Sequence, residues 1–188
     1  MFIQTEATPN PATLKFMPGR PVLGEGTAEF RNAEESRDSP LAARLFEIDG
    51  VTGVFLGSDF ISVSKGEGEA EWQHLKPAIL GAIMEHYLSG EEVTTRSTSS
   101  ERGEDAESYA PEDEETVKTI KELLETRVRP AVAQDGGDIT FQGYREGVVF
   151  LHMRGACAGC PSSTATLRHG IENLLRHFIP EVQEVRPV

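Results

Sequence analysis

A polar, acidic stretch near the middle of the chain constrains its folding most, because it contains almost no apolar side chains to bury. It covers residues 89–112, where serine, threonine, glutamate and aspartate predominate. A segment of this composition cannot bury enough apolar surface to offset the entropy lost on ordering. We therefore expect a flexible acidic linker over residues 89–112 between two small domains, residues 1–88 and 113–188.

The first domain alternates between patterns typical of strands and of helices. Ser39 followed by Pro40 predicts the N-cap and first residue of a short helix. Apolar residues at helical spacing predict a longer helix over residues 71–88. Short runs of β-branched and aromatic residues predict strands over 2–5, 13–17, 28–30, 51–56 and 60–64. The last two runs should form a hairpin, so the domain is expected to be α/β.

The second domain shows the order α-β-β-α-β. Its first helix follows residue 113 and should end or bend at Pro130, because proline lacks an N–H group. After a turn over residues 135–138, the remaining elements are expected at residues 139–144 and 148–153 (a hairpin), from about residue 161 or 162 (a helix), and within 181–188 (an edge strand). The whole chain is therefore expected to be α+β.

The only two cysteines of the chain, Cys157 and Cys160, form a C-x-x-C motif between the predicted hairpin and the last helix. Small residues surround them, which leaves the sulfurs uncovered and lets backbone N–H groups approach. This spacing lets two sulfurs bind one metal centre or form a disulfide. The N-terminus of a helix stabilises negative charge, so we expect thiols with a lowered pKa.

Four interpretations of the motif remain open from the residues alone: a dithiol oxidoreductase, half of a zinc site, half of an iron–sulfur site, or two buried structural cysteines. Either metal site needs four protein ligands in tetrahedral geometry. One chain supplies two cysteines. A metal centre would therefore require a symmetric dimer with the ion or cluster on its axis.

Other polar residues have simpler explanations. Asp135 and Asp138 are expected to form a tight turn with an aspartate capping the next element, rather than an acid–base pair. Arg154 lies beside the cysteine loop and either offsets thiolate charge or is solvated. The histidines that might complete a metal site are expected to lie at the surface; they are His152, His169 and His177.

The overall composition excludes several classes of protein. The net charge of −13 argues against nucleic-acid binding, which needs a basic patch. No apolar run is long enough to span a bilayer, so no membrane association is expected. Two cysteines cannot form the disulfide framework of a small secreted domain, and the N-terminus resembles neither a secretory nor a transit peptide. We expect a cytoplasmic (bacterial) protein, or alternatively a mature form in the mitochondrial matrix.

Several motifs resemble those of one family. The motifs near the C-terminus are closely similar to those of the C-terminal domain of NifU, as found in Nfu-type iron–sulfur carriers. The motifs upstream resemble those of the Nfu N-terminal domain. The C-terminal motifs are Asp135-Gly136-Gly137-Asp138-Ile139, Gly155-Ala156-Cys157, Gly159-Cys160-Pro161-Ser162-Ser163 and Thr166-Leu167. The N-terminal motifs are Thr8-Pro9-Asn10-Pro11, Lys15-Phe16, Ser39-Pro40-Leu41-Ala42, Gly50-Val51 and Asp59-Phe60-Ile61.

The resemblance implies a non-enzymatic scaffold or carrier. In such a protein Cys157 and Cys160, with the same residues of a second chain, would bind a [4Fe-4S] cluster between two subunits. The resemblance further implies a homodimer when the cluster is bound, upstream cluster assembly proteins as donors, and apo iron–sulfur enzymes as clients. A dithiol–disulfide oxidoreductase using the same C-x-x-C motif is the alternative.

Overall fold

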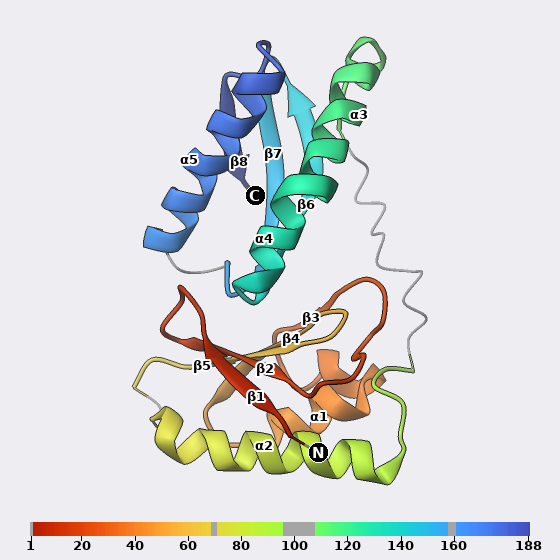
Figure 1. Cartoon of the computed structure of the whole chain (residues 1–188), viewed down its shortest axis with the longest axis vertical. Helices are drawn as coiled ribbons and strands as arrows, with labels where there is room; N and C mark the ends of the chain where they lie inside the picture. Colours follow the sequence, from red (N-terminus) through yellow and green to blue (C-terminus); the bar gives the residue numbers. More distant parts are fainter. Residues whose placement is uncertain (1, 69–70, 96–107, 158–160) are drawn as a thin grey trace. The chain divides into compact units, whose positions relative to one another are not determined.

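The computed structural model describes residues 2–68, 71–95, 108–157 and 161–188, with only the backbone described over 161–163. The chain divides into two compact units, residues 1–101 and 102–188 (Figure 1). Each unit combines a sheet with helices, which confirms the expected α+β class and two-domain organisation. Among the described residues, no helix is long and apolar enough to cross a membrane.

Unit 1 is a five-stranded antiparallel sheet in the order β1-β2-β5-β4-β3. Its strands are β1 (Gln4–Ala7), β2 (Thr13–Met17), β3 (Ala28–Phe30), β4 (Val51–Leu56) and β5 (Ile61–Lys65). β4 and β5 form the expected hairpin. A 3₁₀ turn, η1 (Glu35–Asp38), leads into two helices, α1 (Pro40–Phe46) and α2 (Trp72–Ser89).

The core of unit 1 forms where both helices pack on the same face of the sheet. Alternate residues of the central strands meet one apolar stripe from each helix. The fully buried members of this core are Phe16, Leu41, Ala42, Leu45, Leu56, Ile61, Val63, Ile79 and Ile83. Ser39 begins α1 as predicted, since its hydroxyl accepts a hydrogen bond from the Ala42 N–H at 3.2 Å.

Unit 2 has three strands in the order β6-β7-β8. They are β6 (Gly137–Arg145), β7 (Val148–Gly155) and β8 (Glu184–Pro187); β6 and β7 are antiparallel, while β8 is parallel to β7. The helical segments are η3 (Pro111–Asp113), α3 (Glu114–Leu123), η4 (Leu124–Val128), α4 (Arg129–Gln134) and α5 (Pro161–Phe178). The expected α-β-β-α-β order is confirmed.

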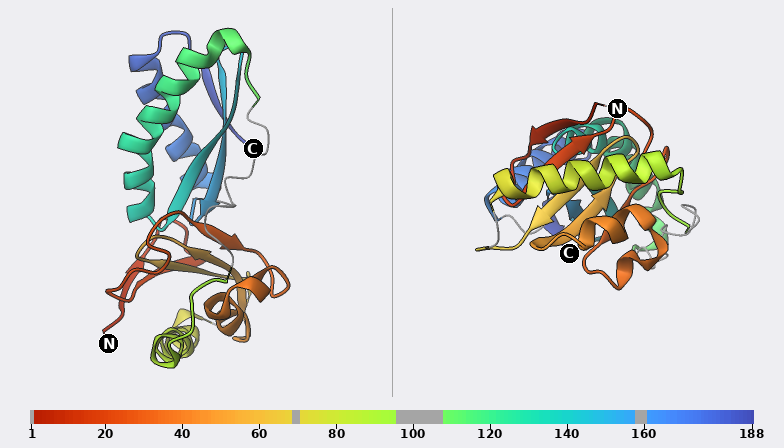
Figure 2. Two further views of the ribbon diagram at one scale, coloured as in Figure 1. Left: turned by 90° about the vertical axis from the view of Figure 1, so that its right-hand side faces the viewer. Right: turned by 90° about the horizontal axis from the view of Figure 1, so that it is seen from below.

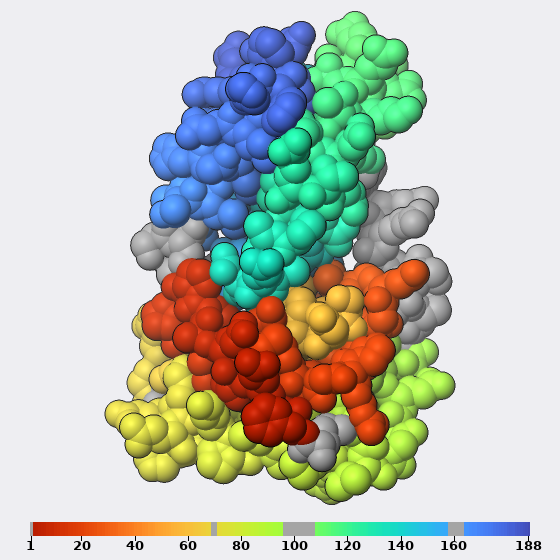
Figure 3. Space-filling view, viewed as in Figure 1, coloured from red at the N-terminus to blue at the C-terminus, as the bar shows by residue number. Residues whose placement is uncertain are grey.

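The helical segments cover a single face of the unit 2 sheet, as the left view of Figure 2 shows. The segment from α3 to α4 and helix α5 together form the surface of this unit on the face viewed in Figure 3. Between them and the sheet lies an apolar core, whose fully buried members are Ile120, Ile139, Val149, Leu151, Leu175 and Val185.

The first helical segment of unit 2 bends rather than ends near Pro130. α3 continues into η4, a five-residue π-helical turn, and Pro130 then occupies the first turn of α4. Proline lacks an N–H and clashes with the preceding turn, and a π-helical turn accommodates such a defect. The bend brings Arg129 to the beginning of α4, where it becomes important for the candidate site.

The two described ends of the predicted linker form hydrogen bonds with the folded part of the unit beside them. The N–H of Thr95 donates to the carbonyl of Asp38 at 2.7 Å within unit 1. Ser108 forms hydrogen bonds with β6 within unit 2. Residues 96–107 lie outside the described residues, so the flexible linker and its bounds at residues 89 and 112 stay a prediction.

Helix α2 carries a histidine, His86, whose side chain is fully buried in unit 1. Among the described residues, neither ring nitrogen has a hydrogen-bond partner. Burial lowers the pKa of His86 first, and the nearby Arg44 guanidinium of α1 lowers it further, while Glu91 opposes both. The imidazole is therefore held neutral.

We predict that unit 1 loses stability in mild acid because of His86. Its pKa is near 6.5 in the unfolded chain and lower in the folded one, so below pH 6.5 the unfolded state binds more protons. The free energy of unfolding should therefore fall as the pH drops below 6.5, until the pH passes the lower pKa of the folded state. Urea unfolding of His86→Phe should show a flatter pH profile, whereas the exposed-site control His74→Gln should behave as the wild type.

Candidate functional site

The candidate site lies where β6 begins and β7 ends. β7 ends at Gly155, whose φ of +65° turns the chain in a conformation that disfavours other residues. The next N–H group, that of Ala156, donates to the carbonyl of Gly136 at 3.3 Å. Gly136 also has a positive φ, of +80°, in the turn before β6. The two turns are therefore bonded side by side.

Cys157 follows this junction and packs into the core of unit 2, with 7% of the residue exposed. Its sulfur lies against the backbone of Gly137. A Cβ atom at residue 137 would be 2.6 Å from Cys157 Sγ and 2.8 Å from the Arg154 carbonyl oxygen. Only glycine fits there without a shift. From α5, the Thr164 hydroxyl donates to the Cys157 carbonyl at 3.0 Å, which fixes the backbone of this residue.

The expected lowering of the thiol pKa is wrong for Cys157. Burial, followed by the nearby carboxylates of Asp135 and Asp138, raises the pKa of this thiol to about 12. The residue precedes the first residue of α5, Pro161, by four positions and joins the apolar core instead. Desolvation and negative neighbours therefore keep the thiol protonated at neutral pH. Cys160, the other predicted ligand, lies outside the described residues.

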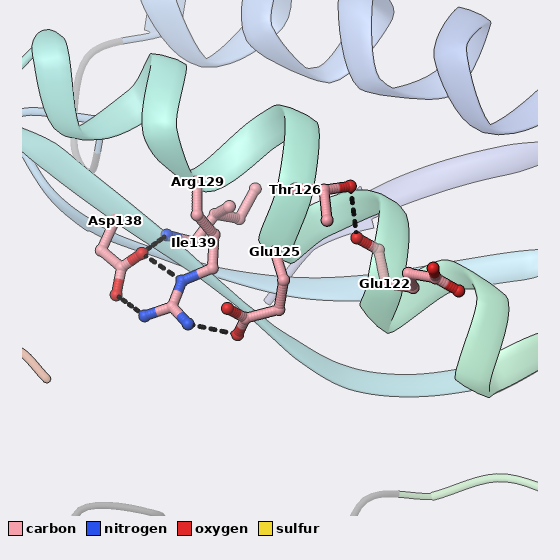
Figure 4. A network of polar contacts seen from close by, with 6 residues as sticks. All are labelled: Glu122, Glu125, Thr126, Arg129, Asp138 and Ile139. Carbon is pink, nitrogen blue, oxygen red and sulfur yellow. Dashed lines mark hydrogen bonds and ion pairs between the residues drawn. The ribbon is translucent and has the colours of Figure 1, made fainter.

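An ion pair between the half-buried Arg129 and the buried Asp138 holds the beginning of β6 to α4 (Figure 4). Arg129 donates from two nitrogens to the two carboxylate oxygens of Asp138, each at 2.9 Å. Asp138, the second residue of β6, also accepts the Ile139 N–H at Oδ1, at 2.8 Å. Glu125, one turn before Arg129, is a second partner of the guanidinium. These contacts raise the pKa of Arg129, so its charge is permanent.

The sequence analysis missed Arg129, because no spacing rule links it to an aspartate nine residues away across a bend. The pair nevertheless lies next to the cysteine turn, since Asp138 adjoins Gly137 and contributes to the field at Cys157. Bidentate arginine–carboxylate pairs fix geometry as well as charge. Arg129 is therefore a positioning residue for the strand against which the sulfur packs.

The remaining predicted polar residues are not brought to Cys157. His169 and His177 are exposed on α5, as expected. His152 is half-buried in β7, where it is paired in register with Thr140. Arg154 is also half-buried, and the charges that shift the Cys157 pKa are those of the two aspartates. An offset of thiolate charge by Arg154 therefore has no support.

Within the described ranges of the chain, no group of three or more histidine, cysteine, aspartate or glutamate side chains is arranged to hold a metal ion. The described part of the site thus offers one thiol ligand at a fixed position. Chemically, such a thiol can bind a soft metal centre once it loses its proton.

Comparison with known proteins identifies both halves of the chain. Residues 3–90 match the sequence model of the family described as "Scaffold protein Nfu/NifU N terminal". Residues 120–186 match the family described as "NifU-like domain". The second match includes Arg129, Gly137, Asp138, Cys157 and Cys160.

Three similar proteins extend over nearly the whole chain. An "NFU1 iron-sulfur cluster scaffold homolog, mitochondrial" of Drosophila sechellia is 51% identical over 189 residues, covering 100% of this chain and 65% of the relative. "NifU-like protein 4, mitochondrial" of Arabidopsis thaliana is 50% identical over 98% of this chain and 65% of the relative. The Homo sapiens "NFU1 iron-sulfur cluster scaffold homolog, mitochondrial" is 48% identical over 100% of this chain and 72% of the relative.

The chain thus spans about two thirds of the length of these relatives, 65% for the first two. Domain order agrees with the two family matches, and Gly136 and Gly155 of the motifs lie at the two turns beside Cys157. The chain therefore belongs to the Nfu/NifU family of iron–sulfur cluster scaffold proteins.

Proposed function

We propose that this chain is a carrier that binds a [4Fe-4S] cluster between two copies and transfers it to apo-proteins. The ligands are Cys157 and Cys160 of each copy. The observation that carries the proposal is the position of Cys157 Sγ at the junction of β6 and β7. The sulfur occupies space that a Cβ atom at residue 137 would need. The printed names of the relatives, which describe iron–sulfur cluster scaffolds, support the same function.

The need for two copies follows from ligand number. A cubane cluster takes four thiolates, and the full sequence contains two cysteines. Two chains related by a two-fold axis supply the remaining pair with the same geometry. Because each chain then holds half of the ligands, the cluster can leave when the two chains separate or when thiols of a client replace them.

The raised pKa of Cys157 favours transfer over permanent storage. Binding of iron must remove the thiol proton, which passes to solvent as the iron–sulfur bond forms. The cost of ionising a thiol beside Asp135 and Asp138 is therefore subtracted from the binding free energy. A protein with this site holds its cluster less tightly than one with preformed thiolates, which suits delivery to a stronger acceptor.

The same observation disfavours the dithiol oxidoreductase. Exchange with a disulfide requires a thiolate, and oxidoreductases of this kind lower the pKa of the attacking cysteine. Cys157 shows the opposite shift. We propose accordingly that the protein has no catalytic activity of its own.

The partners proposed for the carrier are upstream cluster assembly proteins and apo iron–sulfur clients. Unit 1 would contribute to their recognition, because it lacks cysteine and is a complete α/β fold. Its connection to unit 2 would raise the effective concentration of the cluster near a bound client. The relatives' names all include the word mitochondrial, which supports the mitochondrial alternative considered from the sequence; none of the three names supports the bacterial cytoplasm.

Replacing either cysteine should abolish cluster binding. After anaerobic reconstitution with iron and sulfide, Cys157→Ala and Cys160→Ala should each lose the visible absorption and nearly all bound iron. His169→Ala and His177→Ala are matched controls on exposed residues of unit 2 and should retain both. A normal cluster spectrum in Cys157→Ala would remove the ligand assignment.

Adding one methyl group at residue 137 should weaken the site. In Gly137→Ala the new Cβ would overlap Cys157 Sγ and the Arg154 carbonyl. We expect a loss of about 1–3 kcal/mol in the free energy of unfolding, typical of overpacking. Bound iron after reconstitution should fall about tenfold, as for other groups that orient metal ligands.

The control for this experiment is Gly170→Ala on α5, where a Cβ would meet nothing within 4 Å. That variant should keep wild-type iron content and should gain rather than lose stability, because alanine favours the helix over glycine. Wild-type iron content in Gly137→Ala would show that the position of Cys157 tolerates displacement, contrary to the proposal.

A further inference from the structure

The three-stranded sheet of unit 2 has two outer strands, β6 and β8. Outer strands carry backbone groups that can pair with another chain, and natural proteins often block them. In unit 2, other residues of the same chain form hydrogen bonds with backbone groups of both β6 and β8. The residues that form these bonds differ between the two strands.

β8 is blocked by a carboxylate and a proline. The Glu184 N–H donates to the carbonyl of Gly147, just before β7, at 3.2 Å, and the N–H of Val188, just after β8, donates to the carbonyl of Leu151 in β7 at 2.8 Å. The alternation of a strand then directs the amide positions of residues 185 and 187 away from β7. Residue 187 is a proline, which has no N–H.

The remaining outward N–H of β8, that of Val185, is taken up by α5. It donates to Glu172 Oε2 at 3.3 Å. Glu172 is itself held by Arg176, one turn later in α5, at 3.2 Å. At these two positions β8 therefore offers no free donor to an added strand.

β6 is blocked near its end by Ser108 and Tyr109, which lie before the first helical segment of unit 2. The Ser108 N–H donates to the Gln142 carbonyl at 3.2 Å, and the Tyr144 N–H donates to the Ser108 carbonyl at 3.0 Å. A Cβ at Gly143 would lie 2.8 Å from the Ser108 carbonyl oxygen, so glycine is what permits this close approach. The Tyr109 ring lies against Phe141, with ring centroids 6.4 Å apart.

The start of β6 is occupied as well. The Ile139 N–H donates to Asp138 Oδ1 at 2.8 Å. Arg129 holds this carboxylate with two further hydrogen bonds, as Figure 4 shows. The ion pair that positions the strand beside Cys157 therefore also removes a backbone donor.

We propose that both outer strands are blocked so that a second copy of this chain cannot extend the sheet and must join at the cysteine end. A two-fold symmetric sheet extension is antiparallel. It would place the two Cys157 ends about 30 Å apart, the length of a nine-residue strand such as β6. Such a dimer could not share one cluster. The inference rests on the proposed function, because blocked outer strands serve cluster binding only if two copies of the chain share one cluster.

The first test removes the two groups that block β8, in the metal-free full chain. The double variant Glu172→Ala/Pro187→Val restores two outward N–H groups. We expect sedimentation velocity to show one chain for the wild type and a doubled mass for the variant at the same concentration. The matched control Glu172→Gln keeps an amide oxygen as acceptor and should remain a single chain.

A second variant opens β6 independently. In Gly143→Val the new side chain collides with the Ser108 carbonyl, so the Tyr144 amide should exchange faster with deuterium and the mass should rise in the same way. Folded variants whose Val185 or Tyr144 amides exchange fast but whose mass stays that of one chain would overturn the proposal. Metal-free wild type that pairs through β8, with both of its Val185 amides protected by the partner, would also overturn it.

These measurements are made without iron, so they are independent of the proposed function. If the wild type failed to bind a cluster at all, the carrier proposal would fall while the masses still reported whether the outer strands are blocked. If the masses did not change in the opened variants, the carrier proposal would stand and only this inference would fall.

Discussion

The contact between a sulfur atom and a backbone without a side chain is the constraint on which the site depends. Cys157 Sγ occupies the volume that a Cβ at residue 137 would need. Gly137 is also the first residue of β6, and its neighbour Asp138 is bound to Arg129 at the beginning of α4. The position of the thiol is therefore set by the sheet and by the helical segment from α3 to α4 together.

This arrangement reverses the usual preparation of a reactive cysteine. A nucleophilic cysteine is normally exposed to a helix N-terminus or to positive charge, which lowers its pKa. Here burial and two aspartates raise the pKa of the thiol. The permanent positive charge of Arg129 is paired with Asp138 and not with the sulfur. The thiol is therefore protonated and unreactive in the free protein, unlike the attacking cysteine of a dithiol oxidoreductase.

Much of the fold could be predicted from local sequence. The Ser39–Pro40 helix start, the β4–β5 hairpin and the beginning of α5 at Pro161 follow from capping and turn chemistry within a few residues. What could not be predicted depends on contacts between distant segments. The Arg129–Asp138 pair requires the π-helical turn before Pro130, and the burial of Cys157 requires packing against Gly137. The wrong expectation of a lowered pKa followed from placing Cys157 by sequence order alone.

The central claim is that one polypeptide supplies half of the cluster ligands. Native mass spectrometry of the reconstituted full chain, under anaerobic conditions and without added thiols, tests it most directly. The account predicts a species of two chains with one [4Fe-4S] cluster, which separates into metal-free single chains when a chelator removes the iron. A single chain that carries a complete cluster would contradict it.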